Sequence, residues 1–339
     1  MKFTVFRDSN HSSGLLIAVL MALLVAIAGI GGCDRGGETA SEAAPTDRDK
    51  STEARGADAS AQTGVSPTPR LVVSDDLPDR PERIVSLAPN ITEILFALGA
   101  GERVVAVTRF CDYPSEASEL PKVGGMVDTD LEAILSERPD LVVGVTSGGD
   151  AEVAAKLAKA GVAHAFVRMD NLAETYEGIR TIGELADEDE RADAVVAEMK
   201  ERIDASADDG ADDADRPTVL MFYGRDPLIA AGPDTFGHEL IELAGGQNLL
   251  ADAETSYPNL DVEKIISLNP QRIIDASEAA KDDPVDFWGQ YETIDAVAAG
   301  HVYPLRDPVV LRPAPRLAEG LAKIRTAVEG KKQGLRLEE

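Results

Sequence analysis

The chain has 339 residues, of which 44% are hydrophobic and 28% are charged, so it can bury a core in one large or two medium domains. Asp and Glu number 61 against 33 Lys and Arg, and the resulting net charge of −28 opposes binding to nucleic acid. The two cysteines and four histidines show no metal-ligand spacing, so we expect no disulfide scaffold and no metal bound directly by the protein. Gly99-Ala100-Gly101 is an incomplete phosphate-loop pattern, so we expect no cofactor.

Residues 1–32 have the order of a secretory signal peptide. Lys2 and Arg7 precede an uncharged run from Gly14 to Gly32 that is rich in Leu, Ile, Val and Ala. The run ends in Ile-Gly-Gly-Cys, which resembles the bacterial lipobox and implies lipidation of Cys33. In lipoproteins of some Gram-negative bacteria, an aspartate at the position of Asp34 favours retention at the inner membrane. The alternative is an uncleaved transmembrane anchor, because the run is close to the lower length limit for spanning a bilayer.

The segment that follows is too polar to fold. From Asp34 to about Arg70 it has no aromatic residue, and Val65 is its one larger aliphatic residue. We predict a disordered tether that covers residues 33–82. Such a stretch lets a folded body move on the order of 30 Å from a membrane anchor.

From residue 83 onward, short β-rich runs alternate with amphipathic helical runs. This alternation predicts a mostly parallel sheet covered on both faces. It restarts after Pro217, so we predict an amino-terminal lobe at 83–170, a carboxyl-terminal lobe at 211–330 and a tail at 331–339. The predicted strands are 84–87, 104–108, 141–145, 164–167, 219–223, 272–275 and 302–305, and the predicted helices lie near 91–98, 131–137, 151–160 and 237–243.

An internal repeat supports two equivalent lobes. Residues 130–139 and 261–270, which are 131 positions apart, share an acid, an aliphatic residue, Glu, two aliphatic residues, Ser and Pro in the same order. An apolar strand follows each copy. The sequence therefore favours an α/β fold of two pseudo-equivalent lobes.

A long amphipathic helix is predicted from Glu188 to about Asp208, inside a linker at 171–210. Its apolar residues recur every 3.6 positions, and no Gly or Pro interrupts it. About twenty residues span roughly 30 Å. Because one helix is stiffer than a hinge of two or three strands, we expect the lobes to close by small angles.

Several ordered motifs resemble those of a known family. Arg83 to Asn90 followed by Thr92-Glu93, then Cys111 to Pro114, and Arg138 to Val142, are similar to the periplasmic substrate-binding proteins of ABC importers for cobalamin, ferric siderophores and haem. Near the other end, Trp288, Gly300 to Tyr303, and Arg312 to Arg316 resemble the closing segment of that family. The resemblance covers about 83–328. It implies two Rossmann-like lobes joined by a single long α-helix, the helical-backbone metal-chelate receptor type, with the ligand between the lobes.

Candidate ligand-binding residues follow predicted strands. Phe110, Asp112 and Tyr113 come after the 104–108 strand, at the edge where open α/β folds bind ligands, although Asp-Tyr-Pro is also an ordinary turn sequence. The opposing candidates, at the end of the 219–223 strand and just after it, are Phe222, Tyr223 and Arg225. For Phe222 the alternative is a place in the hydrophobic core. Met126 stands where some cobalamin binders have a tryptophan. The full set is Pro89, Asn90, Phe110, Asp112, Tyr113, Met126, Phe222, Tyr223, Arg225 and Arg312.

Glu132 and Glu263 occupy equivalent positions of the repeat. An acidic residue near a helix start can simply complement the helix dipole. One carboxylate on each lobe can also bind paired basic sockets of a two-fold permease. The resemblance implies salt bridges from these two glutamates to permease arginines.

Together these features predict a monomeric, membrane-tethered, extracytoplasmic binding lipoprotein that passes a metal chelate to an ABC permease dimer. The ligand favoured is a corrinoid such as cobalamin, because the Cys-Asp-Tyr-Pro segment is most similar to cobalamin binders. A ferric siderophore and haem, with Tyr113 or Tyr223 as axial ligand, stay open. No catalysis is expected, and Trp288 is expected to be a packing residue. The alternatives are an α/β enzyme with a nucleotide or acyl substrate and an adhesion or sensor module with a vestigial cleft.

Overall fold

The computed structural model describes residues 71–126, 128–146, 150–207, 215–277 and 282–331. These residues belong to one compact unit, Gly64–Glu339. The predicted signal peptide, Cys33, the tether up to residue 70 and residues 332–339 of the tail lie outside the described residues. Within the described ranges, every helix is too short or too polar to cross a bilayer.

The amino lobe, residues 71–186, is built on a five-stranded sheet with the order β1-β5-β4-β2-β3. Four strands run parallel, and β1 pairs antiparallel with β5 at one edge. Since β1 lies in the segment predicted as the end of the tether, the folded region begins before residue 83. The strands are β1 (Leu71–Val73), β2 (Ile84–Ser86), β3 (Val104–Val107), β4 (Leu141–Val145) and β5 (His164–Val167).

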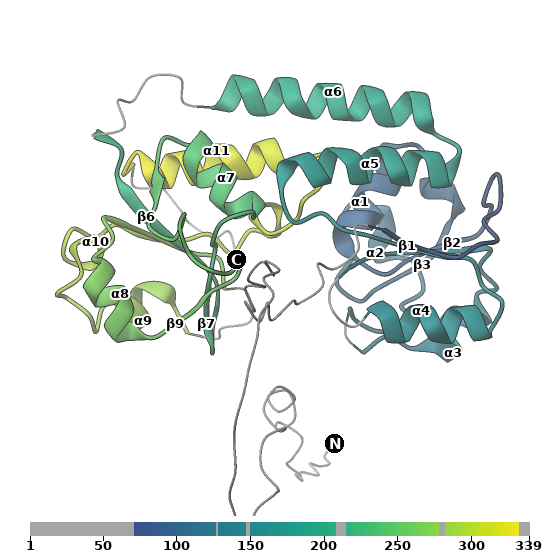
Figure 1. Ribbon diagram of the computed structural model, residues 1–339, viewed down its shortest axis with the longest axis horizontal. Coiled ribbons are helices and arrows are strands. Elements are labelled where there is room, and N and C mark those ends of the chain that lie inside the picture. The colour runs from purple at the N-terminus through teal and green to yellow at the C-terminus, as the bar shows by residue number, and fades with distance from the viewer. Residues whose placement is uncertain (1–70, 127, 147–149, 208–214, 278–281, 332–339) are drawn as a thin grey trace, which may run out of the picture. The chain divides into compact units, whose positions relative to one another are not determined.

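Helices cover both faces of this sheet (Figure 1). Alternate strand residues face opposite layers: Ile84 packs in one core cluster and Val85 in another. On the first face lie α1 and α5, and on the second lie α3 and α4. The helices are α1 (Pro89–Ala97), α2 (Ser115–Ser118), α3 (Leu131–Ser136), α4 (Asp150–Lys159) and α5 (Leu172–Ala186), with a 3₁₀ turn at Gly101–Arg103.

The carboxyl lobe, residues 215–331, has a sheet with the order β11-β10-β6-β7-β9, and β8 pairs with β6. Its sheet is mixed rather than mostly parallel, because β7 and β9 run antiparallel to their neighbours. The strands are β6 (Thr218–Arg225), β7 (Leu228–Ala230), β8 (Gln247–Asn248), β9 (Asn259–Leu260), β10 (Arg272–Asp275) and β11 (Val302–Pro304).

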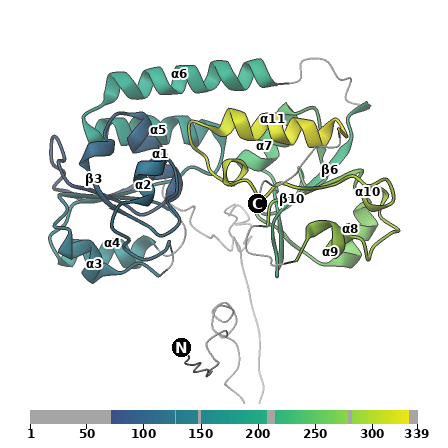
Figure 2. The same cartoon turned by 180° about the vertical axis from the view of Figure 1, so that it is seen from behind.

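Helices cover both faces of this second sheet (Figure 2). Trp288 is fully buried in the hydrophobic core on one face of this sheet, which confirms its predicted packing role. The helices are α7 (Phe236–Leu243) and α11 (Leu317–Val328) on one face and α8 (Val262–Leu268), α9 (Pro284–Trp288) and α10 (Asp295–Ala298) on the other, with a 3₁₀ turn at Pro308–Val310.

The long helix predicted between the lobes is α6 (Asp189–Ser206). It packs against α5 of the amino lobe and α11 of the carboxyl lobe. The linker differs from the prediction because it contains a second helix, α5, which packs on α1 through the amino-lobe core. Asp187 has a left-handed backbone, with φ of 57°, and ends α5 just before α6 begins.

Candidate functional site

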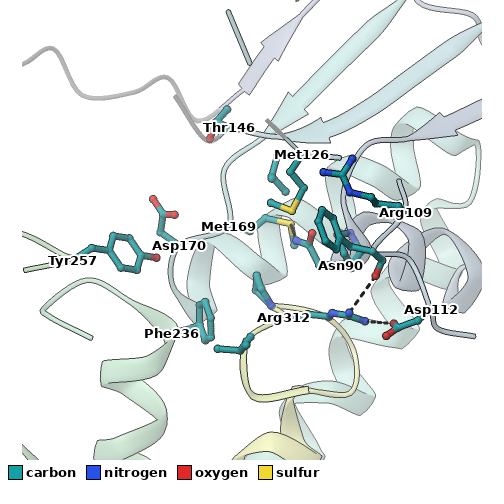
Figure 3. A pocket seen from close by; sticks show the side chains of 15 residues that line it. Asn90, Arg109, Asp112, Met126, Thr146, Met169, Asp170, Phe236, Tyr257 and Arg312 are labelled. Atoms are coloured by element: carbon teal, nitrogen blue, oxygen red, sulfur yellow. Dashed lines mark hydrogen bonds and ion pairs between the residues drawn. The ribbon is translucent and has the colours of Figure 1, made fainter. Parts of the chain in front are cut away.

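A cavity of about 700 Å³ is lined by residues of both lobes (Figure 3). On the amino-lobe side, its wall comes from the segments that follow the parallel strands β2 to β5. Asn90, Phe110, Thr146 and Asp170 each follow a different one of these strands. The cavity therefore lies at the carboxyl edge of the sheet, where open α/β sheets bind ligands. Its volume is in the range typical of small-molecule sites.

Large apolar side chains are exposed on this wall. Phe110 is 49% exposed and Met126 41% exposed, and Tyr257 of the carboxyl lobe is 43% exposed. Exposed apolar side chains that gather in a groove mark binding sites, whereas singly exposed ones are common. Aromatic faces can cover a flat ligand at a low cost in conformational entropy, so this wall suits a large planar molecule.

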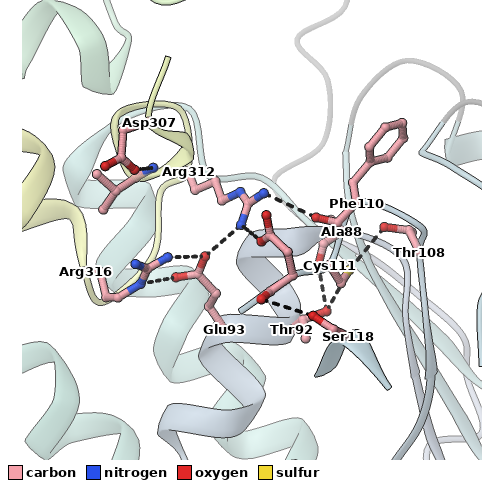
Figure 4. Close-up of polar contacts among 12 residues, drawn as sticks. Ala88, Thr92, Glu93, Thr108, Phe110, Cys111, Ser118, Asp307, Arg312 and Arg316 are labelled. Atoms are coloured by element: carbon pink, nitrogen blue, oxygen red, sulfur yellow. Dashed lines mark hydrogen bonds and ion pairs between the residues drawn. The ribbon is translucent and has the colours of Figure 1, made fainter. Parts of the chain in front are cut away.

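A network of charged residues joins the lobes beside the cavity (Figure 4). Glu93 on α1 is buried and accepts two hydrogen bonds of 3.0 Å from Arg316, through Nε and Nη2. Arg312 Nη1 donates to the same carboxylate at 3.2 Å and to Asp112 at 2.5 Å. Arg312 Nη2 also donates to the carbonyl oxygen of Phe110 at 3.2 Å. Because the two arginines come from the segment before α11, the network ties that segment to the amino lobe.

The charged groups of the cavity wall are partly compensated. Burial raises the pKa of Asp112, but the hydrogen bond and charge of Arg312 outweigh it and hold that pKa below its usual value. Burial and the nearby Glu174 raise the pKa of Asp170. Arg109 pairs with Asp128 at 2.8 Å. The wall thus presents two arginines and two aspartates, with no large excess of either charge.

Six of the predicted cleft residues line the cavity, and four do not. Those that line it are Pro89, Asn90, Phe110, Asp112, Met126 and Arg312. The others are Tyr113, Phe222, Tyr223 and Arg225.

Phe222 and Tyr223 lie inside β6, which continues to Arg225, and not at the strand end where ligands bind. Phe222 points into the core between the sheet and the helices α8, α9 and α10, where its ring centroid lies 4.9 Å from that of Trp288. Tyr223 faces the opposite layer and packs near Phe236, with ring centroids 6.3 Å apart. Successive strand residues point to opposite faces, so both end up in packing layers rather than in the cavity.

Arg225 and Tyr113 have structural partners outside the cavity. Only 4% of the Arg225 side chain is exposed, and it donates to Ser277 at 3.0 Å and lies 3.6 Å from the Asp275 carboxylate. The guanidinium of Arg316 lies 3.5 Å from the ring centroid of Tyr113. Tyr113 therefore belongs to the network between the lobes.

Other lining residues were missed from the sequence. Thr146 directly follows β4, and Met169 and Asp170 follow β5, so the rule that ligands bind at strand ends would have found them. Tyr257 in the loop before β9 lies 131 positions after Met126, so the internal repeat would have pointed to it, whereas Phe236 at the start of α7 has no such signal.

Glu132 and Glu263 are exposed on α3 and α8. Their helices are capped by other residues: Asp130 accepts from the Ala133 amide at 3.0 Å, and Asp261 accepts from the Lys264 amide at 2.7 Å. The glutamates are therefore not needed as caps. Among the described residues, no group of three or more His, Cys, Asp or Glu could hold a metal ion.

Comparison with known proteins gives consistent matches. A family model described as periplasmic binding protein matches residues 84–309. The vitamin B12-binding protein of Vibrio parahaemolyticus is 28% identical over 72% of this chain and 88% of its own length. An uncharacterized ABC transporter substrate-binding lipoprotein of Bacillus subtilis is 33% identical over 73% of this chain and 80% of its own length. The periplasmic heme-binding protein of Roseiflexus sp. is similar in structure, with a TM-score of 0.63 and 29% identity over 74% of this chain and 98% of that one. The predicted two-lobed α/β fold class is confirmed.

Proposed function

Because the chain belongs to the periplasmic binding protein family, we propose that it captures a metal chelate between its lobes and delivers it to an ABC importer. The observation that carries this proposal is the cavity lined by both lobes. A ligand that touches two lobes at once can stabilise one arrangement of the protein over another, and a permease can recognise that arrangement. The chain would act through differential affinity rather than catalysis.

Within this ligand class we favour a corrinoid such as cobalamin. Exposed Phe110, Met126 and Tyr257 provide apolar surface for a large ring. The balanced charges of the wall suit a ligand whose periphery carries neutral amides more than one with several carboxylates. The relative that is named a vitamin B12-binding protein supports the same choice.

Haem is the second candidate, because a tyrosine lines the cavity. Tyr257 is better placed than Tyr113 or Tyr223 to serve as an axial ligand. Burial and the charges of Asp170 and Glu174 raise the pKa of Tyr257 in the ligand-free protein, whereas a bound ferric ion would itself favour the phenolate. Haem ranks below cobalamin because its carboxylates suit the balanced charge of the wall less well, and a ferric siderophore is the third candidate.

Calorimetric titration with cyanocobalamin, a ferric hydroxamate and hemin tests the proposal. We expect saturable binding of cyanocobalamin that weakens about tenfold or more in Phe110→Ala, because an aromatic contact is lost. Val285→Ala removes a side chain that is 51% exposed and does not line the cavity, and it should bind as the wild type does. A Soret shift with hemin that is lost in Tyr257→Phe would instead assign haem. Binding of none of the three would refute the chelate function.

The attachment to the membrane is part of the same proposal. We propose that residues 1–32 are a cleaved signal peptide, that Cys33 is lipidated, and that Asp34 favours the inner membrane. The similarity to a substrate-binding lipoprotein supports this arrangement. Cys33→Ser should release the protein from the membrane fraction, and mass spectrometry of the mature amino terminus should find a diacylated Cys33 in the wild type.

We also propose that Glu132 and Glu263 bind basic residues of the permease. Their equivalent positions on the two lobes and their exposure support this role. Replacing both by Arg should abolish uptake while the calorimetric affinity for the chelate stays unchanged. A double variant that still transports would refute this part of the proposal.

A further inference from the structure

Two large apolar side chains are exposed at equivalent positions of the internal repeat. Leu135 on α3 is 37% exposed and Ile266 on α8 is 39% exposed. They are 131 positions apart, the same offset that relates Glu132 to Glu263. The residues just before them, Ile134 and Ile265, are both fully buried. Each short helix therefore anchors itself with one isoleucine and exposes the next aliphatic residue.

Each exposed aliphatic residue shares a helix face with a glutamate. Leu135 follows Glu132 by three positions, and Ile266 follows Glu263 by three positions, so each pair lies on one side of its helix. Within the part of the chain that the structure describes, neither glutamate has an ion-pair partner. We call Glu132 with Leu135, and Glu263 with Ile266, the paired patches.

The paired patches are close in sequence to the cavity wall. Met126 and Tyr257 both line the cavity, lie 131 positions apart, and precede α3 and α8 by five residues each. The view in Figure 1 and its reverse in Figure 2 show α3 and α8 on the side of the sheets away from α6. In each lobe, a short stretch of sequence therefore separates a cavity-lining residue from a paired patch.

We propose that Leu135 and Ile266 are apolar contacts of a docking surface for one two-fold symmetric membrane partner, in which they flank the docking glutamates. This inference rests on the proposed function. A partner that binds both patches must present the same socket twice, as a two-fold dimer does. Each socket must combine a basic group with apolar surface, because each patch combines an unpaired carboxylate with an aliphatic side chain. A second copy of this chain would bring carboxylate against carboxylate, so the charge favours a basic partner.

Photo-crosslinking on the full-length protein in membranes of its own cells tests the surface without knowledge of the ligand. A benzophenone amino acid is placed at position 135, at 266, or at a control position. Leu71, which is 41% exposed on the edge strand β1, is a control for exposed apolar character, and Glu198 on α6 is a control on the opposite side. We expect positions 135 and 266 to cross-link to the same polypeptide, identified by mass spectrometry as the membrane-spanning subunit of an ABC importer, and the controls not to.

Polar substitution then tests the apolar contact itself. With the cross-linker at 266, Leu135→Asn should lower the yield about tenfold, whereas Leu71→Asn should leave it unchanged. Circular dichroism melting curves confirm that both variants are folded. Cross-links from 135 and 266 to different proteins, to another copy of this chain, or to none would overturn the proposal, as would an unchanged yield in Leu135→Asn. If the wild-type protein bound no chelate in calorimetry, the proposed function would be refuted. The cross-linking result would still test the docking surface.

Discussion

Glu93 is the residue on which the contact between the lobes converges. Its side chain is 2% exposed, and it is paired with both Arg312 and Arg316. Removing one partner of a buried ion pair leaves uncompensated charge in a poorly solvated place. The two arginines would each lose a charged partner at once if the carboxylate were absent.

We predict that Glu93→Ala lowers the free energy of unfolding by about 3 kcal/mol, because both arginines lose their buried partner. Urea denaturation followed by tryptophan fluorescence measures it. Glu319→Gln is the matched control, since the pair of Glu319 with Arg202 is exposed and contributes less than about 1 kcal/mol. Equal effects of the two substitutions would contradict this role of Glu93.

The Asp112–Arg312 pair predicts a pH dependence. Arg312 holds the pKa of Asp112 below its ordinary value of 3.8, so the folded state favours the charged carboxylate. The pair therefore adds stability above about pH 4, and this contribution is lost as the pH falls through the depressed pKa of the folded state. We expect the difference in unfolding free energy between the wild type and Asp112→Asn to be constant from about pH 5 to pH 7 and to shrink below pH 4. Because Asp112 is largely exposed, solvent screening keeps this difference small. If the difference in unfolding free energy grew as the pH fell, Arg312 would not be the group that lowers the pKa of Asp112.

At the scale of elements, α6 depends on its apolar stripe. Ala192, Val195, Val196, Met199 and Ile203 are buried at helical spacing, while the other face is charged. This stripe packs α6 against α5 and α11, so the stripe rather than intrinsic helix propensity holds the helix in place.

Met199→Ala should therefore lower the free energy of unfolding by about 2–4 kcal/mol, through lost burial and a residual cavity. Thermal or chemical denaturation measures the change. The neighbouring exposed Glu198→Ala is the control and should change stability by no more than about 0.5 kcal/mol. If the two substitutions cost the same, α6 would owe its position to something other than the stripe.

At the scale of the whole folded unit, several contacts join the lobes besides α6. The Phe236 amide donates to the Asp170 carbonyl at 2.6 Å, and the Leu172 amide donates to Glu239 at 2.6 Å. Arg325 of α11 also donates to the Ser206 carbonyl at 3.0 Å, which fixes the end of α6 to the carboxyl lobe. With the Glu93 network, these contacts cross the junction at separate places and restrain rotation of one lobe against the other.

We therefore predict that ligand binding changes the arrangement of the lobes only slightly. Small-angle X-ray scattering with and without saturating cyanocobalamin should give the same distance distribution for the folded unit within error. In Glu93→Ala the ligand-free distribution should broaden, because the central contact is lost. A large contraction of the wild type on binding would show a wide hinge motion instead.

The sequence by itself determined the two-lobed α/β fold, the internal repeat and the connecting helix. These features depend on local patterns: β4 is a continuous apolar run, and α6 has a stripe with a period of 3.6 residues. Burial requires such patterns wherever the element sits, so they can be recognised before the fold is known.

Only the tertiary structure decided which candidate side chains reach the cavity. Phe110 is exposed on the wall because β3 ends at Val107, whereas Phe222 is fully buried because β6 continues past it to Arg225. The Glu93–Arg312 contact joins residues 219 positions apart, and Phe236 enters the cavity from the start of α7, where no strand ends. Such contacts depend on how the lobes pack together, and local sequence patterns do not reveal that packing.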